Sequence, residues 1–311
     1  MTKGLQIVGL GLATLDILVR LRQMPTWEQA GPIRAFRFDG GGLVGTAMVA
    51  AAKLGARVGY VGTAGNDEAA ELKLRSFVEA GVDLSRLARR PAPEDQVIMV
   101  YVHAETGERV FAGLENLRGA PLRPDELDRD YIAAAPYLHL DGFHPEAAMQ
   151  AARWAREAGN TVVFDASLAT GPIRDYRRAL VPLTDILISG RDFGYHLTGK
   201  RDIYQAGEEI LALGPRVFVE TVGDQGCYTV TPTERFHTPA FAVPVVDTTG
   251  AGDVFHGAYI VGLLQGWDAR RVAQFASAVS ALKCTVLGGR AGIPTFAQTL
   301  AFLRERGIEM G

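Results

Sequence analysis

A glycine-rich segment with an aspartate at each end carries the clearest chemical signal in the chain. It reads Asp247-Thr248-Thr249-Gly250-Ala251-Gly252-Asp253. A short strand is expected before it at 242–246 and a helix after it, so the small residues fall at a helix N-terminus, where backbone N–H groups can approach an anion closely. With a carboxylate at Asp253 beside that anion, the segment predicts phosphoryl transfer to a hydroxyl group. The alternative is a turn whose aspartate only caps a helix.

This heptad resembles the C-terminal signature of the ribokinase-like (PfkB) family of carbohydrate and nucleoside kinases. The resemblance implies that Asp253 is the general base and that the amides of Gly250, Ala251 and Gly252 form an anion hole. It also implies ATP and Mg²⁺ as cofactors, with Thr248 near the nucleotide and a monovalent cation as a further candidate. A Walker-type ATPase is not supported, because the sequence has no G-x-x-x-x-G-K-[ST] run.

The bulk composition indicates an ordinary globular protein. The 311 residues are 48% hydrophobic and 22% charged, and the net charge of −3 gives no support for binding nucleic acid. The two cysteines, Cys227 and Cys284, make neither a disulfide framework nor a metal-binding spacing. The N-terminus lacks the apolar stretch of a signal peptide, and no run is long enough to span a bilayer. We therefore expect a cytoplasmic protein with no membrane partner.

Strands and helices alternate along most of the chain. Helices are expected near 68–80, 146–158 and 202–213, and strands at 5–10, 137–140, 161–165, 185–188 and 216–220. This order predicts an α/β fold with a mostly parallel sheet and helices on both faces. No linker or internal repeat is visible, so a single domain over 1–311 is expected, and the resemblance implies that it is ribokinase-like.

Two segments, about 16–39 and 95–113, carry short alternating stretches, and the second of them has a hairpin pattern. Together they predict a small sheet that projects from the main body. The resemblance implies that this sheet is a lid over the sugar site and that two copies of the chain associate through it as a homodimer. The alternative is that both segments extend the main sheet.

The N-terminal half holds the candidate residues for the acceptor. The first strand ends in Gly9-Leu10-Gly11, which resembles the start of a dinucleotide-binding fingerprint. Thr14 occupies the position of the third glycine of that fingerprint, which weakens the alternative of a nicotinamide-dependent dehydrogenase. The resemblance implies that Asp16 binds sugar hydroxyls. The further candidate contacts are Gly41, Gly42, Thr46, which replaces the usual asparagine of the family, and Asp141 at a strand end.

The C-terminal half holds the candidate residues for the nucleotide. The run from Ser189 to Asp192 stands where the family has Asn-x-x-Glu, so the resemblance implies a contact at Ser189 and a magnesium-linked role for Asp192. The run Thr221-Val222-Gly223-Asp224-Gln225-Gly226 matches the Thr-x-Gly-x-x-Gly nucleotide loop of the family, which implies contacts at Thr221, Gly223 and Gly226.

The predicted reaction is ATP-dependent phosphorylation of a small sugar of the ketose or pentose type. Two stretches, one around Gly40–Thr46 and one from Val246 to Pro294, resemble sulfofructose kinases. Binding a sulfonate requires basic side chains, but the positions expected to contact it are Ala30 and Gly142, which favours an uncharged acceptor. Arg109 is among the nearest basic residues that could contact an anionic group instead. The alternatives are a sulfofructose or sugar-phosphate kinase, a nucleoside kinase and a catalytically silent sugar sensor.

Overall fold

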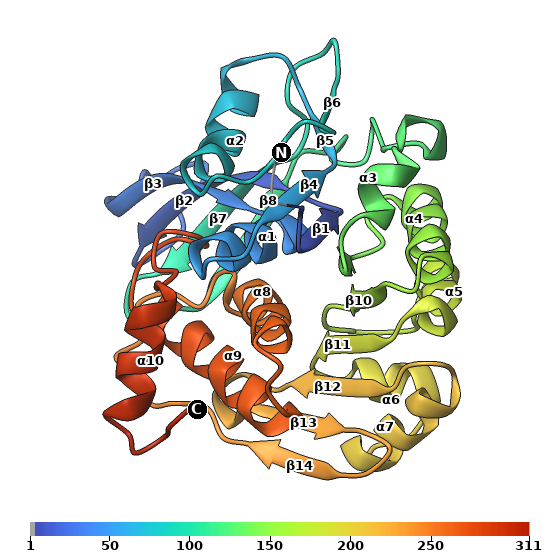
Figure 1. Cartoon of the computed structure of the whole chain (residues 1–311). Coiled ribbons are helices and arrows are strands. Elements are labelled where there is room, and N and C mark those ends of the chain that lie inside the picture. The colour runs from blue at the N-terminus through green and yellow to red at the C-terminus, as the bar shows by residue number, and fades with distance from the viewer. Residues whose placement is uncertain (1–3, 311) are drawn as a thin grey trace.

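An eight-stranded sheet forms the centre of the computed structural model, which describes residues 4–310 (Figure 1). Neighbouring strands from β12 to β4 pair in parallel, and β13 and β14 add an antiparallel edge. Across the sheet the strands are β14 (Arg235–Thr238), β13 (Cys227–Val230), β12 (Val217–Thr221), β11 (Ile186–Gly190), β10 (Thr161–Asp165), β9 (Tyr137–Leu140), β1 (Ile7–Leu10) and β4 (Val58–Val61).

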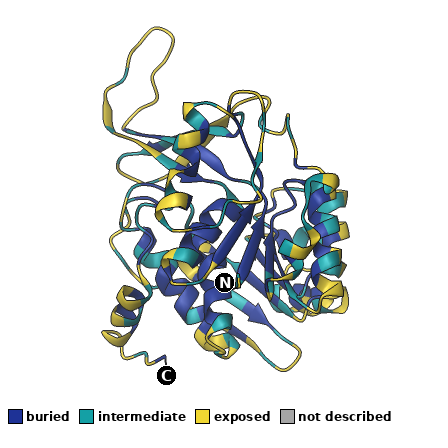
Figure 2. Cartoon of the chain, turned by 45° about the horizontal axis from the view of Figure 1, so that its top comes forward, coloured by how far each residue is buried: buried dark blue, intermediate teal, exposed yellow. Residues whose placement is uncertain are grey.

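Helices cover both faces of this sheet, because successive strand residues point to opposite sides. In β10, Val163 packs into the core on one face, whereas Val162 and Phe164 pack into the core on the other. The strands are accordingly buried between helices whose outer sides are exposed (Figure 2). The first face carries α1 (Leu43–Lys53), α2 (Glu68–Glu79), α8 (Ala251–Leu264), α9 (Ala269–Lys283) and α10 (Phe296–Arg304). The second carries α3 (Arg129–Ala133), α4 (Pro145–Glu157), α5 (Asp175–Leu180), α6 (Phe193–Thr198) and α7 (Ile203–Ala212).

A separate four-stranded sheet, here called the second sheet, is formed by the two N-terminal segments with alternating patterns. Its strands in spatial order are β3 (Ile33–Gly41), β2 (Thr14–Leu21), β7 (Val97–His103) and β8 (Arg109–Gly113). One side packs Leu18, Val100 and Val102 together with Leu287 from the C-terminal part of the chain. The segments therefore do not extend the main sheet. A short two-stranded sheet pairs β5 (Thr63–Ala64) with β6 (Ala88–Arg89). In sequence, both strands fall between β4 of the main sheet and β7 of the second sheet.

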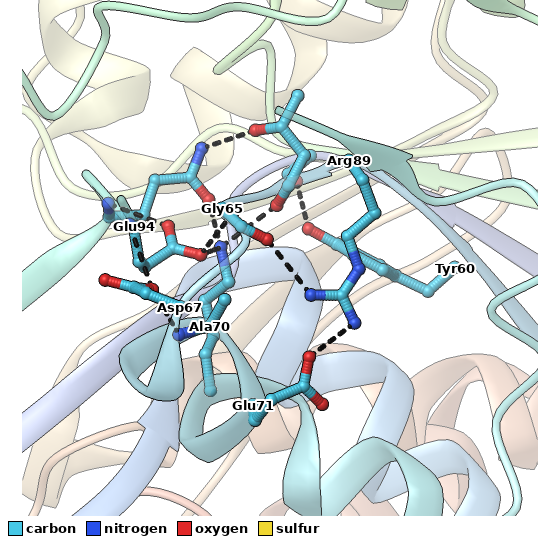
Figure 3. Close-up of polar contacts among 11 residues, drawn as sticks. Tyr60, Gly65, Asp67, Ala70, Glu71, Arg89 and Glu94 are labelled. Atoms are coloured by element: carbon cyan, nitrogen blue, oxygen red, sulfur yellow. Dashed lines mark hydrogen bonds and ion pairs between the residues drawn. The ribbon is translucent and has the colours of Figure 1, made fainter. Parts of the chain in front are cut away.

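A buried ion pair ties the second sheet to α2. Lys73 Nζ lies 2.6 Å from Glu94 Oε2, and both side chains are almost fully buried. Lys73 also donates to the carbonyl of Thr63 at 3.0 Å and to Gln96 Oε1 at 3.1 Å, while Glu94 accepts the amide of Gly65 at 3.0 Å (Figure 3). Because residue 96 directly precedes β7, this network fixes where the second sheet begins.

The structure departs from the sequence prediction in the region before the heptad. The expected strand at 242–246 is an irregular segment, and the edge hairpin of β13 and β14 was not predicted. Pro244 has no N–H group for a strand ladder, and the amide of Val246 donates to Cys284 O at 2.8 Å instead. Among residues 4–310, no helix combines the length and the apolar character needed to cross a membrane.

Candidate active site

A cavity of about 900 Å³ opens at the carboxyl ends of the parallel strands. Asp165, Gly190 and Thr221, which end β10, β11 and β12, line its floor, as expected for a ligand site in an open α/β sheet. The second sheet supplies one wall through β2, β7 and β8, and the heptad supplies another. Of the residues named from the sequence, those in the cavity wall are Asp16, Gly41, Gly42, Thr46, Thr221, Gly223, Gly226, Thr248, Gly250, Ala251, Gly252 and Asp253.

The heptad turns sharply into α8 at Gly250. This residue has φ 72°, and a Cβ there would lie 3.1 Å from Gly289 O, so only glycine fits without strain. The amide of Ala251 already donates to Thr248 O at 3.2 Å and is not free for a ligand. The amides of Gly250, Gly252 and Asp253 have no acceptor among residues 4–310. The free amides are therefore those of Gly250, Gly252 and Asp253, whereas the expected set was Gly250, Ala251 and Gly252.

The first aspartate of the heptad holds the loop in shape. Asp247 is fully buried, and its Oδ1 accepts the amide and the hydroxyl of Thr249 at 2.8 and 2.7 Å. Its Oδ2 accepts the amide of Gly288 at 2.8 Å. Burial would raise the pKa of Asp247, but nearby Lys283 and these hydrogen bonds outweigh burial and lower the pKa. Asp247 therefore stays ionised and clamps the turn that presents the free amides.

Asp253 lies on the first turn of α8, facing the cavity. Its side chain is only partly exposed, and desolvation raises the pKa of Asp253 well above its usual value. The neighbouring carboxylates of Asp165 and Asp16 raise the pKa further, and the positive charges of Arg290 and Arg109 oppose them. A raised pKa gives the carboxylate more basicity than an exposed aspartate has, which suits a group that must take a proton from a hydroxyl.

The carboxylate of Asp16 on β2 lies against Gly41 on β3, which is paired in register with Thr14. A Cβ at Gly41 would lie 2.2 Å from Asp16 Oδ2, so the glycine makes room for the carboxylate. Burial raises the pKa of Asp16 to about 6, although a 2.5 Å hydrogen bond from the hydroxyl of Thr14 acts in the opposite direction. Asp16 therefore forms a buried acceptor group in the cavity wall.

Arg290 is a component of the site that sequence reasoning missed. Its side chain is fully buried beneath the wall formed by Gly41 and Thr46, and it stacks on Phe77 with its Cζ 4.5 Å from the ring centre. It donates to Gly41 O, to Thr46 Oγ1 at 3.3 Å and to Ser76 Oγ at 2.8 Å. A Gly-Gly-Arg-Ala-Gly stretch looks like a surface loop, so its sequence does not signal a buried cation.

A second arginine reaches the site from the second sheet. Arg109 begins β8 and lines the cavity, and its guanidinium donates to Thr248 Oγ1 in the heptad. A positive charge thus stands at the cavity wall close to the anion-binding turn. In contrast, Ala30 and Gly142, on which the expectation of an uncharged acceptor rested, are not among the residues that line the cavity. The basis for that expectation is therefore wrong.

Comparison with known proteins identifies the family. A family model described as pfkB family carbohydrate kinase matches residues 10–296. The chain belongs to this family. It is an ATP-dependent carbohydrate kinase with a ribokinase-like fold, which sets aside the alternative of a nicotinamide-dependent dehydrogenase.

Individual relatives of this PfkB kinase cover nearly all of its length. An ATP-dependent ribose-1-phosphate kinase of Halopiger xanaduensis is 32% identical over 97% of this chain and 99% of the relative. A 5-dehydro-2-deoxygluconokinase of Shouchella clausii is 26% identical over 98% of both chains. Among solved structures, Arabidopsis thaliana ribokinase complexed with ribose and ATP superposes with a TM-score of 0.83 at 24% identity over 97% of this chain and 99% of that one, a likeness that concerns the fold.

The remaining wall of the kinase cavity is largely apolar. Residues of the irregular segment before the heptad, Val243 and Val245, face Ala281 and Cys284 from the end of α9. The Thr221 loop closes this part of the cavity, and the Thr221 hydroxyl donates to Ser189 O at 3.1 Å. This wall therefore offers apolar contacts, as ligand pockets commonly do.

Three residues that were expected to contact a substrate or cofactor, Asp141, Ser189 and Asp192, are not among those that line the cavity. Both carboxylate oxygens of Asp141 accept backbone amides, from Leu12 at 2.9 Å and Phe143 at 2.8 Å, so Asp141 shapes the loop after β1 instead of facing the acceptor. Ser189 is fully buried within β11, and Gly190 and Arg191 take its expected place in the wall.

Asp192, the expected magnesium-linked residue, is exposed and lines a separate cavity of about 200 Å³. Its backbone is left-handed with φ 66°, and its amide donates to Glu220 Oε1 at 3.3 Å. Asp192 is not among the residues that line the larger cavity, and its magnesium-linked role stays a prediction.

Proposed function

We propose that this kinase transfers the γ-phosphoryl group of ATP to a hydroxyl group of a small sugar of the ketose or pentose type. The observation that carries the proposal is the position of Asp253, whose carboxyl group shares the cavity with the free amides at the N-terminus of α8. In this reaction Asp253 accepts the hydroxyl proton, the sugar oxygen bonds to the γ-phosphorus, and the bond from that phosphorus to the β–γ bridging oxygen breaks to release ADP.

The free amides of Gly250, Gly252 and Asp253 would stabilise the charge on the transferring group. They point into the cavity at the positive end of a helix dipole, so they need no rearrangement when charge develops. Arg109 adds a full positive charge near Thr248. Together these donors account for why an anion would bind at this wall, next to the base.

The acceptor would lie against the wall formed by Asp16, Gly41, Gly42 and Thr46. Asp16 accepts hydrogen bonds from sugar hydroxyls, and the two glycines let the sugar approach the backbone. Arg290 donates to Thr46 Oγ1 from beneath and thereby holds this wall in place.

Mg²⁺ would supply positive charge that neutralises the nucleotide phosphates during phosphoryl transfer. Asp192 remains a predicted residue for this ion, and Asp165, which lines the cavity and accepts the amide of Ser167 on Oδ1 at 2.8 Å, would be a second carboxylate able to hold it through water. A monovalent cation remains a further proposed cofactor, tested by comparing turnover in potassium and tetramethylammonium salts.

ADP release measured against ribose, fructose, a nucleoside and their phosphorylated forms tests the proposed function. We expect turnover with at least one small sugar and its loss in Asp253→Asn. ATP and sugar binding without ADP release in the parent chain would instead indicate a catalytically silent sensor and would overturn the proposal.

A second candidate is that the acceptor sugar carries an anionic group. Arg109 at the cavity wall favours it, because a buried anion needs a basic partner within reach. A relative that acts on ribose 1-phosphate is consistent with this candidate, and sulfofructose remains a further anionic possibility. We expect Arg109→Gln to lower kcat/KM for ribose 1-phosphate, fructose 6-phosphate or sulfofructose far more than for ribose. An equal loss for charged and uncharged sugars would place Arg109 on the nucleotide phosphates instead.

We also propose that two copies of the kinase associate through the second sheet, which acts as a lid over the sugar site. Large apolar side chains of its edge strands, Phe36, Phe38, Val110 and Phe111, are exposed. Light scattering after gel filtration tests this, with Phe36→Glu expected to lower the mass to that of one chain. A monomeric parent chain at micromolar concentration contradicts it.

A further inference from the structure

Two histidines and one carboxylate meet beneath the floor of the catalytic cavity. His139 comes from β9, Asp165 from the end of β10 and His256 from α8, and all three are buried. One donor atom from each lies within 4.8 Å of the other two. The shortest recorded separation is 3.5 Å, between His256 Nε2 and Asp165 Oδ2.

One ring nitrogen of each histidine in this cluster lacks a hydrogen-bond partner among residues 4–310. His139 Nδ1 lies 3.1 Å from Val163 O, and because a carbonyl can only accept, this nitrogen carries the hydrogen. The lone pair of His139 Nε2 then has no partner among residues 4–310, and neither does His256 Nδ1. Unpaired polar atoms at this depth call for a ligand or a bound water.

The donor set is that of a transition-metal site. Two neutral imidazoles and a carboxylate suit Zn²⁺, Co²⁺ or Ni²⁺, whereas Mg²⁺ prefers oxygen ligands. A tetrahedral ion with bonds of about 2.0–2.1 Å needs its donors about 3.4 Å apart. The separation of 3.5 Å between His256 Nε2 and Asp165 Oδ2 already meets this, and since all three donor atoms lie within 4.8 Å of one another, binding requires His139 to approach by about 1.4 Å at most. Asp165 and His256 also line the cavity, so an ion can enter and a water can complete its coordination.

We propose that His139, Asp165 and His256 bind one divalent transition-metal ion of the zinc class at the base of the active site. The ion takes His139 Nε2, a carboxylate oxygen of Asp165 and a ring nitrogen of His256. It would draw the Asp165 carboxylate out of the cavity, where the proposed function places it near Mg²⁺. Zn²⁺ would therefore inhibit the kinase without being needed for its reaction.

Titration of the chelator-treated full chain with Co²⁺, followed by visible absorption and calorimetry without ATP or sugar, tests the site. We expect one Co²⁺ per chain with micromolar or tighter affinity, displaced by Zn²⁺ and unaffected by millimolar Mg²⁺. His139→Gln and His256→Asn should each weaken binding at least about tenfold, since even partners outside the ligand set commonly contribute that much.

His144→Gln is the matched control. His144 is equally buried and also has an unpartnered Nε2, but its Nδ1 accepts the amide of Leu122 at 3.1 Å and it is not part of the cluster. Its substitution should leave Co²⁺ affinity unchanged. The proposal is overturned if the parent chain binds no Co²⁺ or Zn²⁺, or if the two cluster variants bind as tightly as the parent. Measuring two cluster variants keeps the result decisive if one of them does not fold.

Discussion

The guanidinium Nε of Arg290 donates a 3.3 Å hydrogen bond to Oγ1 of Thr46, a residue 244 positions earlier in the chain. The family resemblance predicts an asparagine at position 46, whose side chain both donates and accepts. Here Arg290 supplies a buried donor, and the hydroxyl of the fully buried Thr46 accepts from it. The substitution at position 46 and the arginine at 290 are therefore best understood as one arrangement.

Replacing Arg290 with methionine should damage the acceptor site more than the nucleotide site. The change leaves Gly41 O, Thr46 Oγ1 and Ser76 Oγ without their donor, so we expect a loss of about 2–4 kcal/mol in the free energy of unfolding. The KM for the acceptor should rise about tenfold or more, with the KM for ATP changed less than about threefold.

Arg75→Met provides the control for Arg290→Met, because Arg75 is an exposed arginine on the neighbouring helix α2. It should change neither KM. Arg290→Lys keeps the charge but not the planar set of donors, so it should recover stability only in part. Steady-state kinetics and urea unfolding check both expectations, and an unchanged acceptor KM in a folded Arg290→Met protein would contradict the argument.

Asp253→Asn should lower kcat by roughly 10²–10⁴ while ATP still binds, because a positioned general base is lost and the amides remain. Asp175→Asn, on the exposed start of α5, serves as the control and should retain parent activity. Parent-level turnover in Asp253→Asn would disprove the assigned base.

The raised pKa of Asp253 also predicts a pH dependence. Burial and the charges of Asp165 and Asp16 make protonation easier, so the fraction of active, ionised Asp253 falls as the pH is lowered. The kcat/KM profile should lose activity on its acid side at a pH well above the ordinary aspartate value of 3.8. An acid limb near that ordinary value would contradict the burial argument.

The main sheet could be predicted from the sequence because its strands and helices follow simple periodic patterns. The strands ending at Asp165 and Thr221 fall within one residue of their expected ends. The irregular segment around Pro244 was missed, since its apolar run resembles a buried strand and only the ring of one proline opposes that interpretation. The hydrogen bond from the Val246 amide to Cys284 O holds this segment in its irregular conformation.

The site was predictable where a residue's role depends on its local segment. Gly250 and Asp253 follow from the loop-to-helix turn itself. Arg290 was not predictable, because its partners come from segments more than 200 positions away in the chain and meet only in the fold. Asp192 was named from its place in a motif and stays a prediction, because in the fold it has a left-handed backbone and does not line the main cavity.

Asp16→Asn should stabilise the kinase at neutral pH while impairing acceptor binding. The pKa of Asp16 is about 6 in the folded chain against its ordinary value of 3.8, so folding favours the neutral form. The stability that this preference contributes is present below pH 3.8 and is lost as the pH rises through about 6. The difference corresponds to roughly 3 kcal/mol, which is an upper bound on the gain from a neutral asparagine at pH 7.5.

Urea unfolding of the parent and Asp16→Asn at several pH values checks this expectation. We expect the variant to be more stable by about 1–3 kcal/mol at pH 7.5 and the two curves to converge near pH 4. A pH-independent difference between them would show that Asp16 is not held near its neutral form.

Two glycines two positions apart, Gly250 and Gly252, should respond in opposite ways to alanine. Gly250 has φ 72° and its Cβ would press on Gly289 O, so Gly250→Ala should cost at least about 1–2 kcal/mol of stability. Gly252 lies within α8 and its Cβ would meet no atom within 4 Å. Helix propensity then predicts that Gly252→Ala gains up to about 1 kcal/mol.

The activity of Gly252→Ala separates the anion-binding role from a structural one. Its new methyl group would project toward the space where the phosphoryl group is expected, beside the free amides. Losing the use of one such donor lowers kcat by about 10²–10³ in comparable sites. We therefore expect a more stable protein with a lower kcat, measured by thermal unfolding and ADP release. Gly266→Ala, at a left-handed turn after α8 with open space around its Cβ, is the control and should lose stability but keep kcat. A fully active Gly252→Ala protein would mean that the phosphoryl group binds elsewhere in the cavity.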